Sequence, residues 1–132
     1  MDQRGTNRVT ADALPDDVRR LIHFAIPSVP YLEALLLMRS TPGQCWHAGA
    51  IARRLYLGER TAADLLAALS AAGIAVQVPE GYAYQPRDDE LAALLDKLAL
   101  AYSRHLIAIS QLIHSRTDAM PQQFANAFLL RR

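Results

Sequence analysis

The sequence predicts a mainly helical protein that carries one small β-hairpin, and three observations favour this fold class. Ala and Leu, both strong helix formers, supply about a third of the 132 residues, whereas Phe, Trp and Tyr together reach only 7%. Over most of the chain apolar residues recur every three or four positions, as they do on the buried face of a helix. They alternate with other residues only between Ile74 and Tyr84, which indicates a pair of strands.

Chain length, cysteine content and the length of the apolar runs narrow the class of protein further. A chain of 132 residues is expected to form one domain and to bury a core without disulfides. The single cysteine, Cys45, cannot close an internal bridge, which fits a reducing compartment. No apolar run approaches the roughly 20 residues that span a bilayer, and the N-terminus has no apolar segment of signal-peptide length. We therefore expect a cytoplasmic protein without a membrane segment.

The N-terminal third is predicted to hold two helices. Residues 1–10 are polar and aperiodic and are expected to form a flexible arm. The first helix begins at Pro15, whose missing N–H needs no acceptor there, and the acidic pair that follows favours the positive end of the helix dipole. Pro27 stops this helix. A second helix is expected over about 29–39, before the break at Thr41-Pro42-Gly43.

The middle of the chain predicts two further helices joined by a tight turn. Cys45 and Trp46 are expected to form a very short extended piece, with Trp46 packed in the core. A helix from His47 to Leu55 follows, then a turn at Tyr56-Leu57-Gly58. The next helix covers Glu59 to Ala72, and Gly73 stands where a left-handed helix cap is usual.

The alternating stretch predicts a hairpin with a three-residue loop, Pro79-Glu80-Gly81. Pro79 presets the turn and Gly81 supplies a positive φ. Tyr82 and Tyr84 point to one face of the second strand, where packing is expected rather than base stacking.

A long helix is predicted over residues 87–116, because acidic residues at its start are followed by an unbroken apolar stripe up to Ser115. Such a helix would run on the order of 40 Å at 1.5 Å per residue, which exceeds the body it would cover. We therefore expect its stripe to pair with a second copy of the chain, although it could instead cover the core of the monomer. The residues predicted for the dimer interface are Leu91, Leu95, Leu98, Tyr102, Leu106, Ile109 and Ile113. Residues 117–132 are predicted to form a short amphipathic tail helix with Phe124 and Phe128 on one face.

The stretch from Ile51 to Val76, IARRLYLGERTAADLLAALSAAGIAV, resembles bacterial winged helix-turn-helix regulators of the MarR and PadR kind. In those proteins an apolar residue and Leu flank the turn, and a Leu-rich recognition helix ends in Ala-Gly-apolar. The resemblance covers about 55 of the 132 residues. It implies a winged helix-turn-helix domain over residues 11–86, with Glu59 to Ala72 as recognition helix and Ile74 to Tyr84 as wing. It also implies a dimeric transcriptional regulator that binds double-stranded DNA.

The candidate DNA contacts lie on both sides of the predicted turn. In regulators of this kind the recognition helix enters the major groove, so an Arg contacts phosphates or a guanine edge, and a Thr contacts a phosphate or a thymine methyl. A solvated helix surface is the alternative explanation for these side chains. From His47 to Arg87 four arginines stand against three acidic residues, so strong binding requires a dimer that doubles the contacts. The candidates are Arg53, Arg54, Arg60 and Thr61.

A protein-interaction module is the alternative function. Most of the recognition helix that faces solvent is expected to be Ala or acidic, and the surface between Leu65 and Ala72, the long helix, or the tail with Phe124 and Phe128 would then dock on a protein partner. The dependence of DNA binding on salt separates the two functions, because only phosphate binding releases counterions.

Metal, cofactor and enzyme chemistry are not expected. The four histidines have no i,i+4 pairing with each other or with Cys45, and the chain has no C-x-x-C or H-E-x-x-H spacing. It also lacks a Gly-rich phosphate loop and a nucleophile elbow, and capping of the following helix explains Asp88-Asp89-Glu90. Cys45 would act as a redox sensor only if it is exposed and its thiolate is stabilised.

Overall fold

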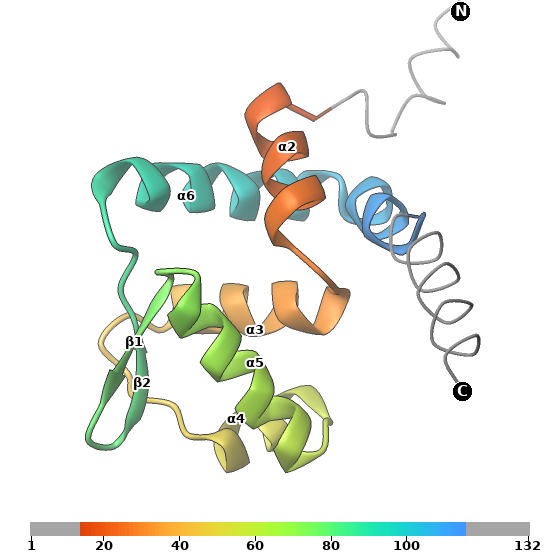
Figure 1. The fold of residues 1–132 in the computed structure, drawn as a ribbon. Helices are drawn as coiled ribbons and strands as arrows, with labels where there is room; N and C mark the ends of the chain where they lie inside the picture. The colour runs from red at the N-terminus through yellow and green to blue at the C-terminus, as the bar shows by residue number, and fades with distance from the viewer. Residues whose placement is uncertain (1–13, 116–132) are drawn as a thin grey trace, which may run out of the picture. The chain divides into compact units, whose positions relative to one another are not determined.

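The computed structural model describes residues 14–115, and it confirms a mainly helical fold with one antiparallel β-hairpin (Figure 1). The predicted arm over residues 1–10 and the predicted tail helix over 117–132 lie outside the described residues. The chain divides into two compact units: a central unit, Pro30–Asp96, and a terminal unit, which in the described range comprises residues 14–29 and 97–115. In chain order the labelled elements are α2 (Asp16–Ala25), α3 (Val29–Ser40), α4 (Ala48–Leu55), α5 (Glu59–Ala71), β1 (Ala75–Val78), β2 (Gly81–Tyr84) and α6 (Asp89–Arg104), and a helix over Leu106–Ser115 follows.

The terminal unit is built on α2, which begins and ends close to the predicted residues. Pro15 is its N-cap, and the Pro15 carbonyl accepts a hydrogen bond from the Arg19 N–H at 3.0 Å. Its apolar stripe is buried at Val18 and Ile22. The Lys97 ammonium donates to Asp17 at 2.5 Å and lowers the pKa of that carboxyl. This ion pair joins α6 to α2 within the terminal unit.

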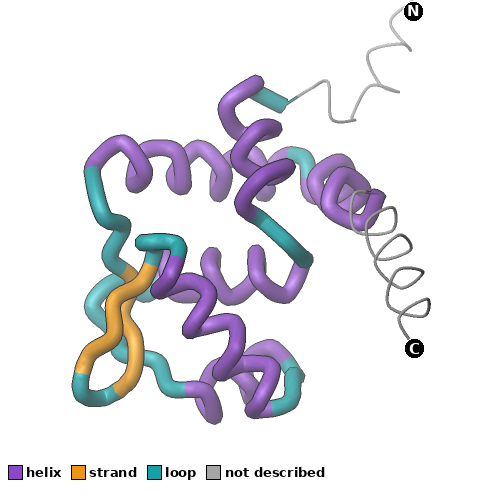
Figure 2. Tube along the Cα trace, viewed as in Figure 1, coloured by secondary structure: helices purple, strands orange, loops and turns teal. Residues whose placement is uncertain are grey.

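The central unit consists of α3, α4, α5, the hairpin and the first half of α6 (Figure 2). α3 is the most deeply buried of them because its apolar residues are not confined to one stripe. α4 begins after His47, whose Nδ1 accepts a hydrogen bond from the Ala50 N–H at 3.3 Å and caps the helix. α5 ends one residue earlier than predicted, and Gly73 adopts the predicted left-handed conformation with φ +79°.

The hairpin is confirmed, but its loop is shorter than predicted. Val78 pairs with Gly81, so only Pro79 and Glu80 form the loop and the predicted three-residue loop is wrong. The backbone of Trp46 runs directly against Gly81: a Cβ at Gly81 would lie 2.2 Å from the Trp46 carbonyl oxygen. The backbone of Trp46 exchanges two hydrogen bonds with Tyr82, at 2.7 and 2.8 Å. The short extended piece predicted before α4 is therefore an isolated β-bridge between Trp46 and Tyr82 beside the two-stranded sheet.

Trp46 fixes this bridge in the core, as predicted. Its side chain is 2% exposed, and its ring N–H donates to the Thr41 hydroxyl at 3.0 Å. Burial of an indole with its N–H satisfied is strongly stabilising. Trp46 is thus held in two ways: its backbone bonds to β2, and its ring bonds to Thr41.

The prediction of one long helix over residues 87–116 is wrong. α6 ends at Arg104 and a separate helix begins at Leu106, although the His105 N–H still donates to the Ala101 carbonyl at 2.7 Å. A straight helix would keep Leu106 on the apolar stripe, whereas the break leaves it 49% exposed. The reason lies in packing: the second helix lies beside α2, and there it buries Ala108 as well as the Ile109 and Ile113 of the stripe.

Tyr84 places a phenol at the edge of the central unit's core, where its burial raises its pKa. The Tyr84 hydroxyl is buried and has no hydrogen-bond partner among the described residues. The Arg39 guanidinium acts on the same phenol and lowers its pKa, and Asp96, which accepts from Arg39 at 2.9 Å, raises it. An unpaired buried hydroxyl opposes folding.

Replacing Tyr84 with Phe is therefore expected to leave the free energy of unfolding unchanged or to raise it by about 1 kcal/mol. The folded state favours the neutral phenol over the ionised one. The free energy of unfolding therefore does not depend on Tyr84 ionisation below about pH 10, and it falls as the pH rises through the higher pKa of the folded protein. Urea unfolding at pH 8 and pH 11 should show a smaller loss of stability at pH 11 in Tyr84→Phe than in the parent. An equal loss in both proteins would contradict the assignment.

Among the described residues, no helix combines the length and the apolar character needed to cross a membrane.

Candidate nucleic-acid interface

The turn between α4 and α5 is held by backbone hydrogen bonds. Tyr56 adopts the left-handed conformation, with φ 57° and ψ 50°, and this reverses the chain at the end of α4. The Leu57 N–H then donates to the Ala52 carbonyl at 2.9 Å, and Gly58 starts α5 by accepting from the Ala62 N–H at 3.0 Å. α4 packs directly on α5 through their buried faces, so the two helices form one packed element.

All four predicted contact residues lie on this element and are exposed. Arg53 and Arg54 stand in the last turn of α4, while Arg60 and Thr61 stand in the first turn of α5. No carboxylate in residues 14–115 forms an ion pair with any of the three arginines. Two of them, Arg53 and Arg60, therefore have guanidinium groups open to an external anion.

Arg54 is placed by an aromatic contact that the sequence analysis did not anticipate. Its guanidinium carbon lies 5.7 Å from the centre of the Trp46 ring, within the range of a cation–π interaction. The side chain of Trp46 thus connects the β-bridge next to the hairpin with the last turn of α4.

The first turn of α5 adds partial positive charge to the same surface. Its N-cap is Gly58, and no side chain caps the helix. The first backbone N–H groups are therefore available to donate to another acceptor. The helix dipole places positive potential at this end, next to Arg60. Glu59, in the same turn, is the one acidic side chain there.

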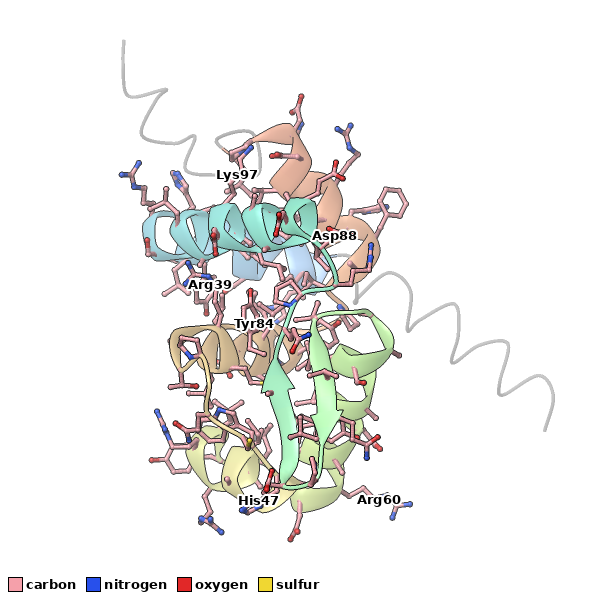
Figure 3. The ribbon with its side chains drawn as sticks, turned by 90° about the vertical axis from the view of Figure 1, so that its left-hand side faces the viewer. Arg39, His47, Arg60, Tyr84, Asp88 and Lys97 are labelled. Carbon is pink, nitrogen blue, oxygen red and sulfur yellow. The ribbon has the colours of Figure 1, made fainter. Side chains whose placement is uncertain are left out.

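Figure 3 shows Arg60 and His47 at one end of the central unit and Asp88 at the other. Both ends carry charges of both signs. In α6, Asp96 pairs with Arg39 at 2.9 Å, whereas the three arginines that flank the α4–α5 turn form no ion pair with a described carboxylate. Free guanidinium groups, and not an excess of positive charge, therefore distinguish the α4–α5 end.

Tyr56 is a surface feature that the sequence analysis treated only as part of the turn. It is the most exposed large apolar or aromatic residue among the described ones, at 93%. A tyrosine within a turn carries no periodic signal, since its exposure follows only from its backbone conformation.

The predicted dimer stripe is largely covered within one chain. Leu95, Leu98, Ile109 and Ile113 are each fully buried, so only Leu91, Tyr102 and Leu106 retain accessible surface. Burial of these four side chains agrees with the alternative interpretation, in which the stripe covers the core of the monomer. In the terminal unit the exposed large apolar side chains are Phe24, Leu100, Leu106 and Ile107. Dimerisation itself stays a prediction.

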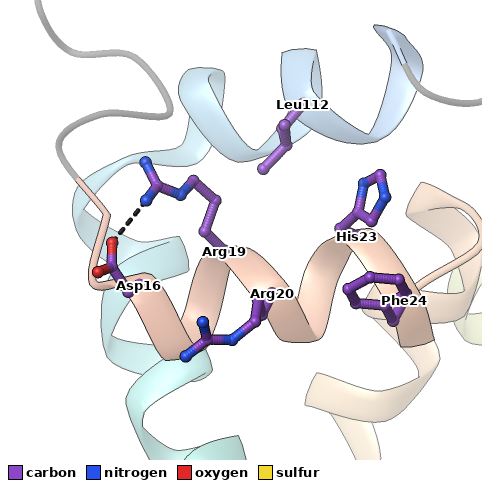
Figure 4. Close-up of a pocket in the computed structure, with 6 residues that line it drawn as sticks. All are labelled: Asp16, Arg19, Arg20, His23, Phe24 and Leu112. Atoms are coloured by element: carbon purple, nitrogen blue, oxygen red, sulfur yellow. Dashed lines mark hydrogen bonds and ion pairs between the residues drawn. The ribbon is translucent and has the colours of Figure 1, made fainter.

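The terminal unit carries a shallow pocket of about 380 Å³ beside α2 (Figure 4). Asp16 holds Arg19 at 2.5 Å on one side, and the His23 ring meets the Phe24 ring edge-on at 4.6 Å on the other. The lining combines neither a nucleophile with a base nor a set of convergent carboxylates. Within residues 14–115, no group of three or more His, Cys, Asp or Glu side chains is placed to hold a metal ion.

No protein-family model, curated protein or solved structure matches this chain. The resemblance of Ile51 to Val76 to MarR-like and PadR-like regulators therefore rests on the motif and on the order of the elements.

Proposed function

We propose that this chain is a cytoplasmic transcriptional regulator that binds double-stranded DNA as a homodimer, in the manner of the winged helix-turn-helix regulators that its central stretch resembles. One observation carries the proposal. Arg53, Arg54 and Arg60 flank the α4–α5 turn, exposed and without ion pairs to described carboxylates.

The arrangement suits phosphate binding. Arg60 and the uncapped N–H groups of α5 face solvent at the same helix end, and a helix N-terminus with a neighbouring guanidinium is a common phosphate site. The position of Arg53 and Arg54 on the preceding helix corresponds to the helix that crosses the DNA backbone in helix-turn-helix proteins. In a dimer, six arginines would contribute about −5 to the slope of log K against log salt concentration (the salt slope), at roughly −0.9 per phosphate contact.

A protein-interaction module is the second candidate, and the surface of α5 favours it. The solvent face of that helix carries four exposed alanines, Ala63, Ala67, Ala68 and Ala71, which allow another backbone to approach closely. Docking through this surface would bury apolar area and release few counterions, so its affinity would change little with salt.

Replacing Arg60 with Ala is expected to reduce the affinity for any duplex and to make the slope of log K against log salt shallower by about two units for a dimer, one per protomer. The matched control is Arg104→Ala, which removes an exposed arginine of the terminal unit. Fluorescence anisotropy with one labelled duplex at several salt concentrations measures both quantities. If the duplex affinity of the parent protein does not depend on salt, the proposed function is wrong. Equal salt slopes in the parent and in Arg60→Ala would exclude Arg60 from DNA binding.

A further inference from the structure

Tyr56 is the residue whose placement the fold itself does not explain. It is the one non-glycine residue in residues 14–115 with a positive φ, and its ψ of 50° puts it in the left-handed helical region. An L-residue is strained there because its Cβ crowds the backbone, and glycine is the residue that usually ends a helix in this way. A tyrosine at this position therefore destabilises the turn relative to glycine.

Packing does not compensate for this strain. The Tyr56 side chain is 93% exposed, so its ring buries almost no surface within the chain. The turn is closed by the backbone of its neighbours, through the Leu57 N–H and the Gly58 carbonyl. No hydrogen bond of the Tyr56 hydroxyl to a described residue is found.

Three exposed arginines lie close to Tyr56 in the sequence, on both sides of the turn. Arg53 and Arg54 precede it on α4, Arg60 follows it on α5, and the uncapped end of α5 begins two residues later. Strained residues cluster at binding surfaces, where a ligand can offset the strain, and Tyr56 is both strained and exposed in the turn that separates these arginines. A phenol offers an O–H donor for an anionic oxygen and a flat ring for a sugar face.

We infer that Tyr56 contacts the sugar–phosphate backbone of DNA, with its hydroxyl donating to a phosphate oxygen between the phosphates held by Arg53 and Arg60. This inference rests on the proposed function and adds to it a contact of a different chemical kind. Because the phenol is neutral, its contact releases no counterion. Because it meets backbone and not base edges, it strengthens binding to every sequence alike.

Two substitutions separate the hydroxyl from the backbone strain. Tyr56→Phe keeps the ring and the strain, and it is expected to lower duplex affinity about 3- to 10-fold while leaving the salt slope and the melting temperature unchanged. Tyr56→Gly relieves the strain, and it is expected to lower duplex affinity at least as much while raising the melting temperature by about 2–4 °C. Tyr84→Phe is the matched control, since it removes a hydroxyl that solvent does not reach.

Anisotropy titrations of these variants against two unrelated duplexes, with thermal unfolding of each protein, test the inference. The expected result is an equal loss of affinity for both duplexes in the two Tyr56 variants and none in Tyr84→Phe. Parent-like affinity in Tyr56→Phe, alongside a shallower salt slope in Arg60→Ala, would overturn the role of Tyr56 and leave the proposed function intact. A parent protein without salt-dependent duplex binding would overturn both, and would point to Tyr56 as a contact for a protein.

Discussion

Replacing Gly81 with Ala is expected to lower the free energy of unfolding by about 3 kcal/mol or more. The φ of Gly81 is +138°, a conformation that side chains rarely adopt, and an added Cβ would lie 2.2 Å from the Trp46 carbonyl oxygen and 2.8 Å from its carbonyl carbon. Both obstacles are backbone atoms, so no side-chain rotation relieves them. The chain at Trp46 would have to leave β2 and give up the two hydrogen bonds that it exchanges with Tyr82.

The measurement is urea unfolding followed by the emission of Trp46, the single tryptophan of the chain, which is buried in the folded state. The matched control is Gly49→Ala within α4. There the new Cβ would meet the His47 ring at 3.4 Å, an ordinary contact, and a helical Gly-to-Ala change is expected to stabilise by about 0.5–1 kcal/mol. If Gly81→Ala unfolds at the same urea concentration as the parent, the claim that the Trp46 backbone leaves no room for a side chain at position 81 is wrong.

The double variant Arg53→Ala/Arg60→Ala is expected to weaken duplex binding by about 100-fold or more at 0.1 M salt, and to make the salt slope shallower by three to four units. A dimer loses four phosphate contacts, two from each protomer, and each contributes roughly 0.9 to the slope. The fold should survive, because both side chains are exposed and neither forms an ion pair with a described carboxylate.

Arg20→Ala/Arg104→Ala is the matched control for this variant. It removes the same charge from two exposed positions of the terminal unit and should leave the affinity within about threefold of the parent, because the proposed contacts all lie in the central unit. Titrations at four salt concentrations from 50 to 200 mM give the slopes, with the concentrations chosen to span the steep range. Equal losses in the two double variants would place the DNA surface somewhere other than the α4–α5 turn.

Local patterns were sufficient to predict most of the secondary structure. Pro15 and the acidic pair after it mark the start of α2, and Gly73 marks the end of α5, because these residues act through their own backbone geometry and charge. The candidate contacts were also predictable, since an arginine on the solvent side of an amphipathic helix is recognised from its spacing alone. Periodicity failed at His105, where the apolar stripe continues through a helix break.

The remaining features depend on contacts between residues distant in the sequence. The glycine at position 81 was assigned to the hairpin loop, whereas the contact that excludes a side chain there comes from Trp46, thirty-five positions earlier. The sequence left open whether the apolar stripe of the long helix meets a second copy or the core of the same chain, because amphipathicity does not distinguish the two. The Arg54–Trp46 contact and the buried, unpartnered hydroxyl of Tyr84 have no counterpart in any local pattern.

The sequence by itself thus determined where helices and strands form and which charged side chains face solvent, since propensity, capping and periodicity act over a few residues. Only the tertiary structure decided which apolar faces are consumed within the chain, why Gly81 admits no side chain, and that Tyr56 stands strained and exposed between the arginines. Those properties come from excluded volume and burial, and both depend on which distant segments meet when the chain is folded.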